Sequence, residues 1–357
     1  LQSAGAGWRS SPSAQELAGT FGEASIELEA HAHEDDCSEK GSNKGSAITK
    51  VSSARTPFHA GPRWTDDARR LRKVLSLRPQ RPPRVLMVTR RHFRKNKYVD
   101  IVGEYHLELV QENGAAPVVI PRTTQTVFHL AEYLPMDGLI IAEGNDLSDE
   151  ILRKYGCQTP GRLDSEASQK FASDTEFDVS KDELEFALMR FALASGCPIL
   201  TLCRGSQMLS ALRGGTLIGD IESEVGSSIC HLKDCSDPAY DSNRHSIRVS
   251  PDTPLAEWFS ESLQNTDELL VNSYHHQSVK TLGENLVEMA RAPDGILEAF
   301  YDPNYDVALG RFVVGLQFHP ERMLEDYPGC AKVYKAFGDA CWAYKNLQDG
   351  RVTRDSP

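Results

Sequence analysis

The chain has 357 residues, of which 40% are hydrophobic and 25% are charged, as is usual for a globular protein. Its formal net charge of -12 argues against general nucleic-acid binding, because a phosphate-binding surface needs an excess of lysine and arginine. Its eight cysteines are irregularly spaced and form no C-x-x-C pair, which argues against a zinc ribbon or a thioredoxin-like motif and favours a reducing compartment.

No run of apolar residues approaches the roughly 20 that a membrane helix needs, so we expect no membrane partner. Together with the cysteine usage, this favours a cytoplasmic location. The chain begins at Leu1 rather than at a methionine, which leaves a targeting segment for an organelle open.

Two stretches precede the expected globular domain. Residues 1–62 are rich in serine, glycine, alanine and acidic residues and lack a sustained apolar period, which predicts disorder. His31 and His33 lie near Cys37 and could bind a metal, but nothing nearby would hold a coordination geometry, so a flexible polar tail is favoured. Residues 63–83 are basic and predict a linker helix, with a nuclear-localisation or anionic-surface role as the alternative.

The expected globular domain covers residues 84–348, and residues 349–357 form a tail. Its first part alternates apolar runs with stretches of helical spacing. Strands are predicted at 85–88, 117–120 and 137–142, and helices at 101–114 and 127–134. Such alternation predicts a parallel sheet with right-handed crossovers, whose active site lies at the carboxyl ends of the strands.

A long connection at residues 147–178 shows no clear periodicity, which predicts a functional lid or a disordered segment. Ser180 and Glu183 then have the spacing of a capping box, so we expect a helix to begin there. Gly196 ends this helix, and Pro198 precedes the next strand.

Residues 198–209 predict a strand, a sharp turn at Cys203 and an amphipathic helix. A nucleophile at such a turn is lifted clear of the sheet, and the first amides of the helix point at the group it attacks. Gly205 allows a close backbone approach where a side chain would collide with the preceding strand. The alternative is that Cys203 is a small buried hydrophobic residue, the usual role of a lone cysteine.

The strands predicted after residue 217 are shorter and are separated by turns, so we expect a mixed or antiparallel extension of the fold. These strands are expected at 245–249, 269–271, 286–290 and 296–301. A further buried strand at 313–318 ends in a His-Pro-Glu sequence, and a final helix is predicted over 330–347.

Catalysis by a thiol needs an imidazole that takes and returns the proton, and a third group that orients the imidazole. His319 stands at the end of an apolar strand, Pro320 turns the chain, and Glu321 can reach back to the far ring nitrogen. A structural role for His319 is the alternative. The combination with Cys203 and a glycine loop, each at the end of a buried strand, favours catalysis.

Three motifs resemble the class I glutamine amidotransferase superfamily: CRGSQ at 203–207, GGTL at 214–217 and GLQFHPE at 315–321. The sequence NSYHHQ at 272–277 narrows the resemblance to the peptidase C26 branch, which contains γ-glutamyl hydrolases and γ-glutamyl-γ-aminobutyrate hydrolases. Residues 90–109 resemble the plant-type glutamine amidotransferases of that branch.

The resemblance covers residues 84–347 and implies an α/β fold. This fold is a flavodoxin-like three-layer sandwich with a mostly parallel sheet and a small mixed β extension. The resemblance also implies a triad of Cys203, His319 and Glu321, which attacks the side-chain amide of glutamine or of a γ-glutamyl compound. A γ-glutamyl thioester forms, and water completes the hydrolysis.

By the same resemblance, the backbone N–H groups of Arg204 and Gly144 hold the oxyanion. Gln207 contacts the glutamate end of the substrate, and His275 and Gln277 line the pocket. The alternatives are a helix-surface position for Gln207 and hydrogen-bonding loop positions for the other two. We expect no cofactor and no metal.

Two residues depart from the pattern of the superfamily. Thr201 stands two residues before Cys203, where the family usually has glycine, and its side chain could crowd the turn. Glu143 replaces the first residue of a Gly-Gly pair, and its charge could raise the pKa of the nearby thiol.

The leading functional interpretation is a cysteine-dependent hydrolase of γ-glutamyl amides or a free-standing glutaminase. One alternative is a glutaminase subunit that passes ammonia to a partner synthase on another polypeptide. A second is a catalytically weak protein that binds a γ-glutamyl ligand. We expect a small-molecule γ-glutamyl substrate and no nucleic acid; a homodimer and the identity of the γ-glutamyl compound stay open.

Overall fold

The computed structural model describes residues 80–123, 126, 129–160, 177–233 and 237–350. Apart from residues 80 and 81, these belong to one compact unit that contains residues 82–357. The disorder predicted for residues 1–62 lies outside the described residues. So does the linker helix predicted at 63–83, except for residues 80–83, which are not helical. Within the described ranges, no helix combines the length and the apolar character needed to span a bilayer.

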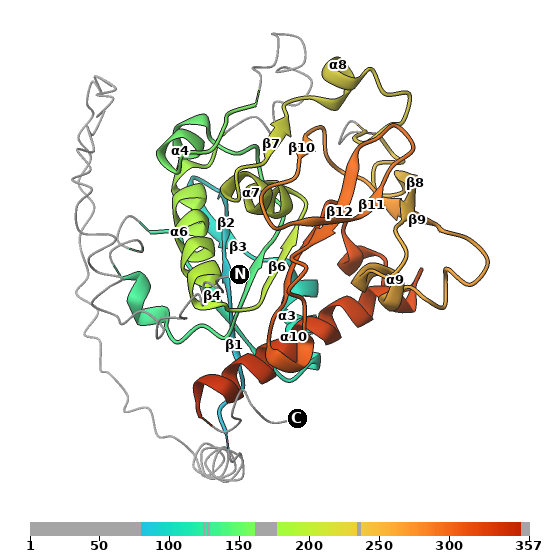
Figure 1. The fold of residues 1–357 in the computed structure, drawn as a ribbon. Coiled ribbons are helices and arrows are strands. Elements are labelled where there is room, and N and C mark those ends of the chain that lie inside the picture. The colour runs from blue at the N-terminus through green and yellow to red at the C-terminus, as the bar shows by residue number, and fades with distance from the viewer. Residues whose placement is uncertain (1–79, 124–125, 127–128, 161–176, 234–236, 351–357) are drawn as a thin grey trace, which may run out of the picture. The chain divides into compact units, whose positions relative to one another are not determined.

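A nine-stranded sheet forms the centre of this unit, in the order β4-β1-β5-β6-β13-β12-β11-β8-β9 (Figure 1). The first five neighbours run parallel: β4 (Ala116–Ile120), β1 (Arg84–Val88), β5 (Gly138–Ile141), β6 (Ile199–Leu202) and β13 (Val313–Leu316). The last four are antiparallel to their neighbours: β12 (Leu297–Tyr301), β11 (Val287–Arg291), β8 (Arg244–Val249) and β9 (Glu268–Asn272). The expected mixed extension therefore continues the central sheet.

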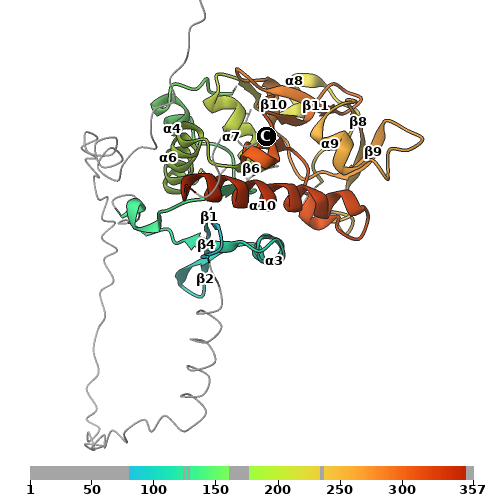
Figure 2. The ribbon, with the colours of Figure 1, turned by 60° about the horizontal axis from the view of Figure 1, so that its bottom comes forward.

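Helices cover both faces of the sheet, as the apolar runs predicted. Side chains alternate across a strand, and Val85 and Met87 of β1 pack into a cluster with α3 (Glu104–Glu112) and α10 (Pro328–Gln348), whereas Leu86 lies outside that cluster. On the other face, α6 (Val179–Ser195) and α7 (Arg204–Leu212) pack against each other and against β5 and β6 (Figure 2). The predicted three-layer α/β sandwich is confirmed.

Apart from the hairpin described in the next paragraph, the remaining elements are short. They are the antiparallel pair β7 (Thr216–Ile218) and β10 (Ser278–Thr281), the short helices α4 (Asp149–Lys154), α8 (Ile221–Val225) and α9 (Pro254–Trp258), and the 3-10 turns η1 (Leu130–Tyr133), η2 (Val307–Leu309) and η3 (Pro320–Arg322).

The helix predicted over 101–114 begins only at Glu104, because the residues before it form a hairpin. Strand β2 (Arg90–Arg94) pairs antiparallel with β3 (Lys97–Ile101), and the turn residues Lys95 and Asn96 have φ angles of 52° and 57°. The sequence of this hairpin shows no alternation of apolar and polar residues that would predict its strands, because its side chains are mostly exposed.

Three further predictions differ from the structure. Of the helix predicted over 127–134, the described residues form only the 3-10 turn η1. The connection at 147–178 contains α4, and residues 161–176 of it lie outside the described part. Helix α6 begins at Val179, one residue before Ser180, because Asp178 is its N-cap and accepts the backbone N–H of Lys181 at 3.2 Å. Gly196, with a φ of 67°, ends α6 as predicted.

Candidate active site

Cys203 lies at the turn between β6 and α7, as predicted. Its backbone has φ 49° and ψ -114°, a conformation that costs a residue with a side chain about 1–3 kcal/mol. The Cys203 N–H donates to the carbonyl oxygen of Leu316 at 2.7 Å, and its own carbonyl accepts from the N–H and the hydroxyl of Ser206. These contacts hold the thiol, which forms no disulfide, at the carboxyl edge of the sheet.

Gly205 packs tightly, but against a different strand from the one expected. A Cβ at this position would lie 2.2 Å from the carbonyl oxygen of Ile141, at the end of β5 rather than of β6. The first turn of α7 can therefore rest on the loop that follows β5. Gly144 belongs to that loop, and a Cβ there would lie 3.0 Å from Cδ of Arg204. The absence of two side chains thus lets the backbone at residue 144 approach the start of α7.

Thr201 fits into the sheet without crowding the turn. The residue is fully buried, and its hydroxyl donates to the carbonyl oxygen of Val314 at 3.0 Å. Gly315 stands opposite Thr201 in the neighbouring strand. Where the superfamily usually has a glycine in β6, this chain therefore has a buried side chain that is hydrogen-bonded to the neighbouring strand.

His319 and Glu321 meet directly after β13. Nδ1 of His319 lies 2.8 Å from Oε1 of Glu321, and both side chains are buried. Pro320 begins the 3-10 turn η3, which folds the carboxylate back under the ring. With Nδ1 occupied by the carboxylate, Nε2 is the ring nitrogen left for the thiol.

The charge on His319 is stabilised by its neighbours. Burial alone would lower the pKa of His319, but the negative charge of Glu321 and hydrogen bonds with Cys203 and Glu321 raise it well above its usual value. An imidazolium beside a cysteine is the environment that favours the nucleophilic thiolate. The structure therefore brings together the three residues of the predicted triad.

Glu143 lies close to this triad, as expected, but it has its own partners. Its carboxylate is 3.4 Å from Nε2 of His106 and 3.9 Å from Nη1 of Arg90. Burial would raise the pKa of Glu143, yet the hydrogen bond from His106 and the charges of His319, His106 and Arg90 hold it well below its usual value. Glu143 is therefore an anion whose charge is balanced by His106, Arg90 and His319.

The side chain of Arg204 is buried in a network of charges that the sequence did not predict. Its guanidinium pairs with Asp182 and Glu185, and Lys181 lies 2.9 Å from Glu185. Burial would lower the pKa of Arg204, but Glu185 and Asp182 raise it. The carboxylate of Asp182 also accepts the backbone N–H of Ser148 at 2.7 Å, so one network holds the start of α7, the buried face of α6 and the loop after β5.

Gln207 is buried, so the alternative of a helix-surface position is wrong. Its amide donates to the backbone carbonyl of Gln277 at 3.1 Å and to the side-chain oxygen of Gln317 at 3.2 Å. The side-chain oxygen of Gln277 is also buried, and no described residue donates to it. Two of the three predicted pocket residues therefore lie side by side.

The ring of His275 lies between the backbone of Gln277 and the carboxylate of Glu298. Its Nδ1 donates to the carbonyl oxygen of Gln277 at 2.9 Å, while Nε2 lies 3.6 Å from the carboxylate of Glu298. Burial lowers the pKa of His275 to about 3, so the ring is neutral. The residue reaches the predicted pocket through Gln277 rather than by its own free nitrogen.

Two residues that support the candidate site, Asn272 and Gln317, were not predicted, although both lie in quoted motifs. Asn272 accepts the backbone N–H of His319 at 2.8 Å and donates to its carbonyl oxygen at 2.8 Å. Gln317 precedes the His-Pro-Glu sequence and joins Gln207. The NSYHHQ motif, which Asn272 opens, was the sequence signal for this residue. Its role becomes visible only in the fold, where the end of β9 meets the segment after β13.

A buried cysteine at a strand-to-helix turn, beside a histidine–glutamate pair at the end of the next parallel strand, defines a class I glutamine amidotransferase-like protein. A family model described as Peptidase C26 matches residues 84–321, which is more than half of the chain. The chain therefore belongs to the peptidase C26 family, and so to hydrolases of the amidotransferase and γ-glutamyl hydrolase type.

The chain is also similar to individual proteins. Protein NtpR of Enterococcus hirae is 31% identical over 59% of this chain and 77% of its own length. A gamma-glutamyl-gamma-aminobutyrate hydrolase of Escherichia coli O157:H7 is 25% identical over 72% of this chain and 93% of its own. The solved structure of a glutamine amidotransferase from Thermotoga maritima is 14% identical over 75% of this chain and 99% of its own, with a TM-score of 0.37.

Proposed function

We propose that this chain is a cysteine-dependent hydrolase of γ-glutamyl amide bonds that acts through a γ-glutamyl thioester. The observation that carries the proposal is the set of contacts around His319. One ring nitrogen is held by Glu321 at 2.8 Å, and Cys203, at the end of the neighbouring parallel strand, supports the charged form of the ring. A nucleophile, a base and an orienting carboxylate in this order are what thiol hydrolysis requires.

In the proposed reaction, Nε2 of His319 already holds the thiol proton, and the thiolate sulfur of Cys203 attacks the amide carbonyl carbon. The tetrahedral intermediate then loses ammonia or an amine, which takes the proton from His319 as the carbon–nitrogen bond breaks. Water next adds to the thioester and gives a proton to His319. The carbon–sulfur bond breaks, glutamate leaves, and the thiolate is restored.

We assign the oxyanion to the backbone N–H groups of Arg204 and Gly144. The proximity of these two residues supports the assignment, because a Cβ at residue 144 would lie only 3.0 Å from Cδ of Arg204. One well-placed donor of this kind is worth about 3 kcal/mol of barrier. The network around Arg204 would keep both donors in place without any movement during the reaction.

We assign the pocket for the glutamate end of the substrate to Gln207, Gln277 and His275. The side-chain oxygen of Gln277 is a buried acceptor for which no described residue supplies a donor, and the α-ammonium group of a glutamyl substrate carries such donors. The name of the Escherichia coli relative, a gamma-glutamyl-gamma-aminobutyrate hydrolase, agrees with a substrate of this class.

The test combines a label with a substrate panel. A diazoketone analogue of glutamine should alkylate Cys203, and the purified chain should release glutamate from some members of a panel of γ-glutamyl amides that includes glutamine. Cys203→Ala should abolish labelling and lower hydrolysis by about a thousandfold or more. The matched control is Cys230→Ser, because Cys230 is exposed and also free. Hydrolysis that survives in Cys203→Ala would refute the proposal.

The same assay separates the alternatives. Release of free ammonia from glutamine by the purified chain would argue against an obligate partner synthase. Labelling of Cys203 without turnover of any panel member would instead support a catalytically weak γ-glutamyl-binding protein.

A further inference from the structure

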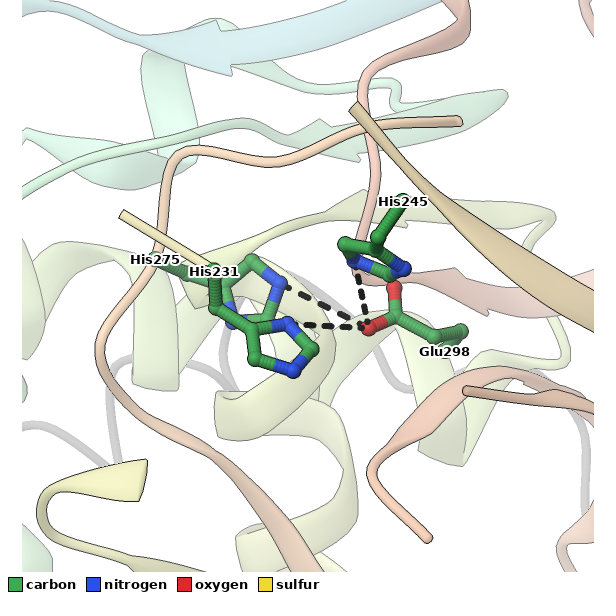
Figure 3. A group of neighbouring side chains, drawn as sticks. All are labelled: His231, His245, His275 and Glu298. Carbon is green, nitrogen blue, oxygen red and sulfur yellow. Dashed lines mark ion pairs between the residues drawn. The ribbon is translucent and has the colours of Figure 1, made fainter. Parts of the chain in front are cut away.

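Four buried side chains converge at a point outside the triad. His231 comes from the segment between α8 and β8, His245 from β8, His275 from the segment between β9 and β10, and Glu298 from β12 (Figure 3). Each is at most 6% exposed. A single oxygen of Glu298 lies 3.7 Å from Nδ1 of His231, 3.4 Å from Nε2 of His245 and 3.6 Å from Nε2 of His275.

Each imidazole uses its other nitrogen to bind an acceptor outside the cluster. Nδ1 of His245 lies 3.1 Å from the carbonyl oxygen of Ser246, and Nδ1 of His275 lies 2.9 Å from that of Gln277. Because a carbonyl oxygen can only accept, these two Nδ1 atoms carry the hydrogen. Nε2 of His231 lies 2.8 Å from the carboxylate of Asp294 and donates in the same way. The nitrogens that face Glu298 therefore present lone pairs.

The inward-facing atoms have no hydrogen-bond partner in the described part of the chain. This holds for the three ring nitrogens and for both oxygens of Glu298. Buried polar atoms without partners are costly, and here five acceptors face one another. A proton on Glu298 could form a hydrogen bond with only one of the three rings. The distances of 3.4–3.7 Å between the Glu298 oxygen and the ring nitrogens also exceed the 2.7–3.2 Å of a usual hydrogen bond. A cation between the four groups would satisfy all of them.

We propose that His231, His245, His275 and Glu298 bind one Zn²⁺ ion. In a tetrahedral zinc site with bonds of about 2.0–2.2 Å, ligand atoms lie roughly 3.3–3.6 Å apart. The three distances to Glu298 come close to this spacing before any side chain moves. Three imidazole ligands favour zinc over magnesium or calcium, which prefer oxygen. Outward hydrogen bonds to a carboxylate and to backbone carbonyls are the usual supports of zinc-bound histidines.

The proposed site is structural. Four protein ligands complete a tetrahedron and leave no position for water or substrate. The ion would fasten the segments that carry His231 and His275 to the strands that carry His245 and Glu298. It would also bear on the pocket, because the carbonyl oxygen of Gln277 accepts from both His275 and Gln207. This inference departs from the sequence-based expectation of no metal, and it does not rest on the proposed hydrolysis.

The test measures metal in the full chain, purified without a histidine tag. We expect about one zinc ion per chain when the metal content is measured by elemental mass spectrometry. His245→Gln and Glu298→Gln should each lower this content about tenfold or more. Two controls should keep it: His92→Gln, which changes an exposed histidine, and Cys230→Ser, which removes an exposed thiol next to His231.

A second measurement uses only the wild-type chain, in case the variants fold poorly. A chelator should remove the zinc and lower the melting temperature, and added Zn²⁺ should restore both. Co²⁺ added to the chelated chain should produce the strong visible bands of tetrahedral cobalt. The proposal is overturned if the untagged chain carries no zinc and melts at the same temperature with and without Zn²⁺, or if zinc survives at full content in both cluster variants.

Discussion

Asn272 holds both backbone groups of His319, with 2.8 Å from its side-chain oxygen to the histidine N–H and 2.8 Å from its side-chain nitrogen to the histidine carbonyl oxygen. Asn272 is the last residue of β9, at the far edge of the central sheet, and it is fully buried. Its side chain makes the two hydrogen bonds to the His319 backbone that a neighbouring strand would make if β13 continued. The position of the proposed base is thus set by the end of a strand that is not its neighbour in the sheet.

Asn272→Ala should therefore affect both stability and catalysis. The change leaves a buried N–H and a buried carbonyl oxygen without partners, so we expect a loss of about 2–4 kcal/mol in the free energy of unfolding. We also expect kcat to fall by about tenfold to a hundredfold with a smaller change in KM, because the imidazole is displaced while the pocket remains. Urea unfolding and steady-state kinetics measure the two effects. Asn304→Ala, at an exposed asparagine, is the control.

Thr201 provides a test of whether the turn at Cys203 is crowded. Thr201→Val keeps the shape but removes the hydroxyl that donates to Val314, so we expect it to cost about 1 kcal/mol of stability. Thr201→Gly creates a cavity and loosens the strand, so we expect about 2–3 kcal/mol. Neither should raise kcat. A clear gain in kcat for the glycine variant would mean that the threonine does strain the turn.

The buried network around Arg204 should contribute far more to the free energy of unfolding than a partly exposed ion pair does. Arg204→Met leaves the buried carboxylate of Asp182 without its cation and leaves Glu185 with Lys181 alone, so we expect a loss of about 3–5 kcal/mol in the free energy of unfolding. Arg213→Met breaks a partly exposed pair with Asp302 and should cost at most about 1 kcal/mol. Thermal or urea unfolding of both variants decides the comparison.

Arg204→Lys adds a check on the mechanism of this effect. Lysine keeps the charge but cannot contact both carboxylates with a planar fork, so an intermediate loss of stability is expected. Equal losses for Arg204→Met and Arg213→Met would show that the network contributes no more than a surface ion pair.

The strands at the centre of the fold could be predicted because each carries a local signal. Residues 85–88, 199–202 and 313–316 are short, mostly apolar runs, as expected for strands that are buried on both faces. Cys203 and the His319–Glu321 pair follow two of these runs directly. Their meeting then results from β6 and β13 being parallel neighbours, which places both strand ends at one edge.

The features that sequence reasoning missed depend on partners from distant segments. Lys181, Asp182 and Glu185 look like the solvated face of a helix, but they are buried, and Arg204 of another element pairs with both carboxylates. The hairpin of β2 and β3 is mostly exposed and therefore lacks an apolar period. The three histidines and Glu298 come from four segments with no ligand spacing typical of a zinc motif, so their convergence follows from the fold alone.

The pair formed by His319 and Glu321 predicts a dependence of stability on pH. The folded-state pKa of His319 lies well above the 6.5 of a free imidazole. The charged imidazole therefore contributes its full stabilisation of the fold below about pH 6.5. This contribution is lost as the pH rises through the folded-state pKa of His319. Glu321→Gln removes the main cause of this shift. The difference in unfolding free energy between the parent and Glu321→Gln should be about 1–3 kcal/mol near neutral pH and should shrink towards alkaline pH.

The measurement is urea unfolding at a series of pH values from neutral upwards, with both proteins in a Cys203→Ser background. This background removes the titrating thiol, whose hydrogen bond also supports the charged imidazole. Glu325→Gln, at an exposed glutamate four residues away, should show no difference that changes with pH. A difference between parent and Glu321→Gln that grows towards alkaline pH would have the wrong sign for an imidazolium held by Glu321. His319 would then be neutral in the folded chain, and the proton it needs as an acid would have to come from the thiol alone.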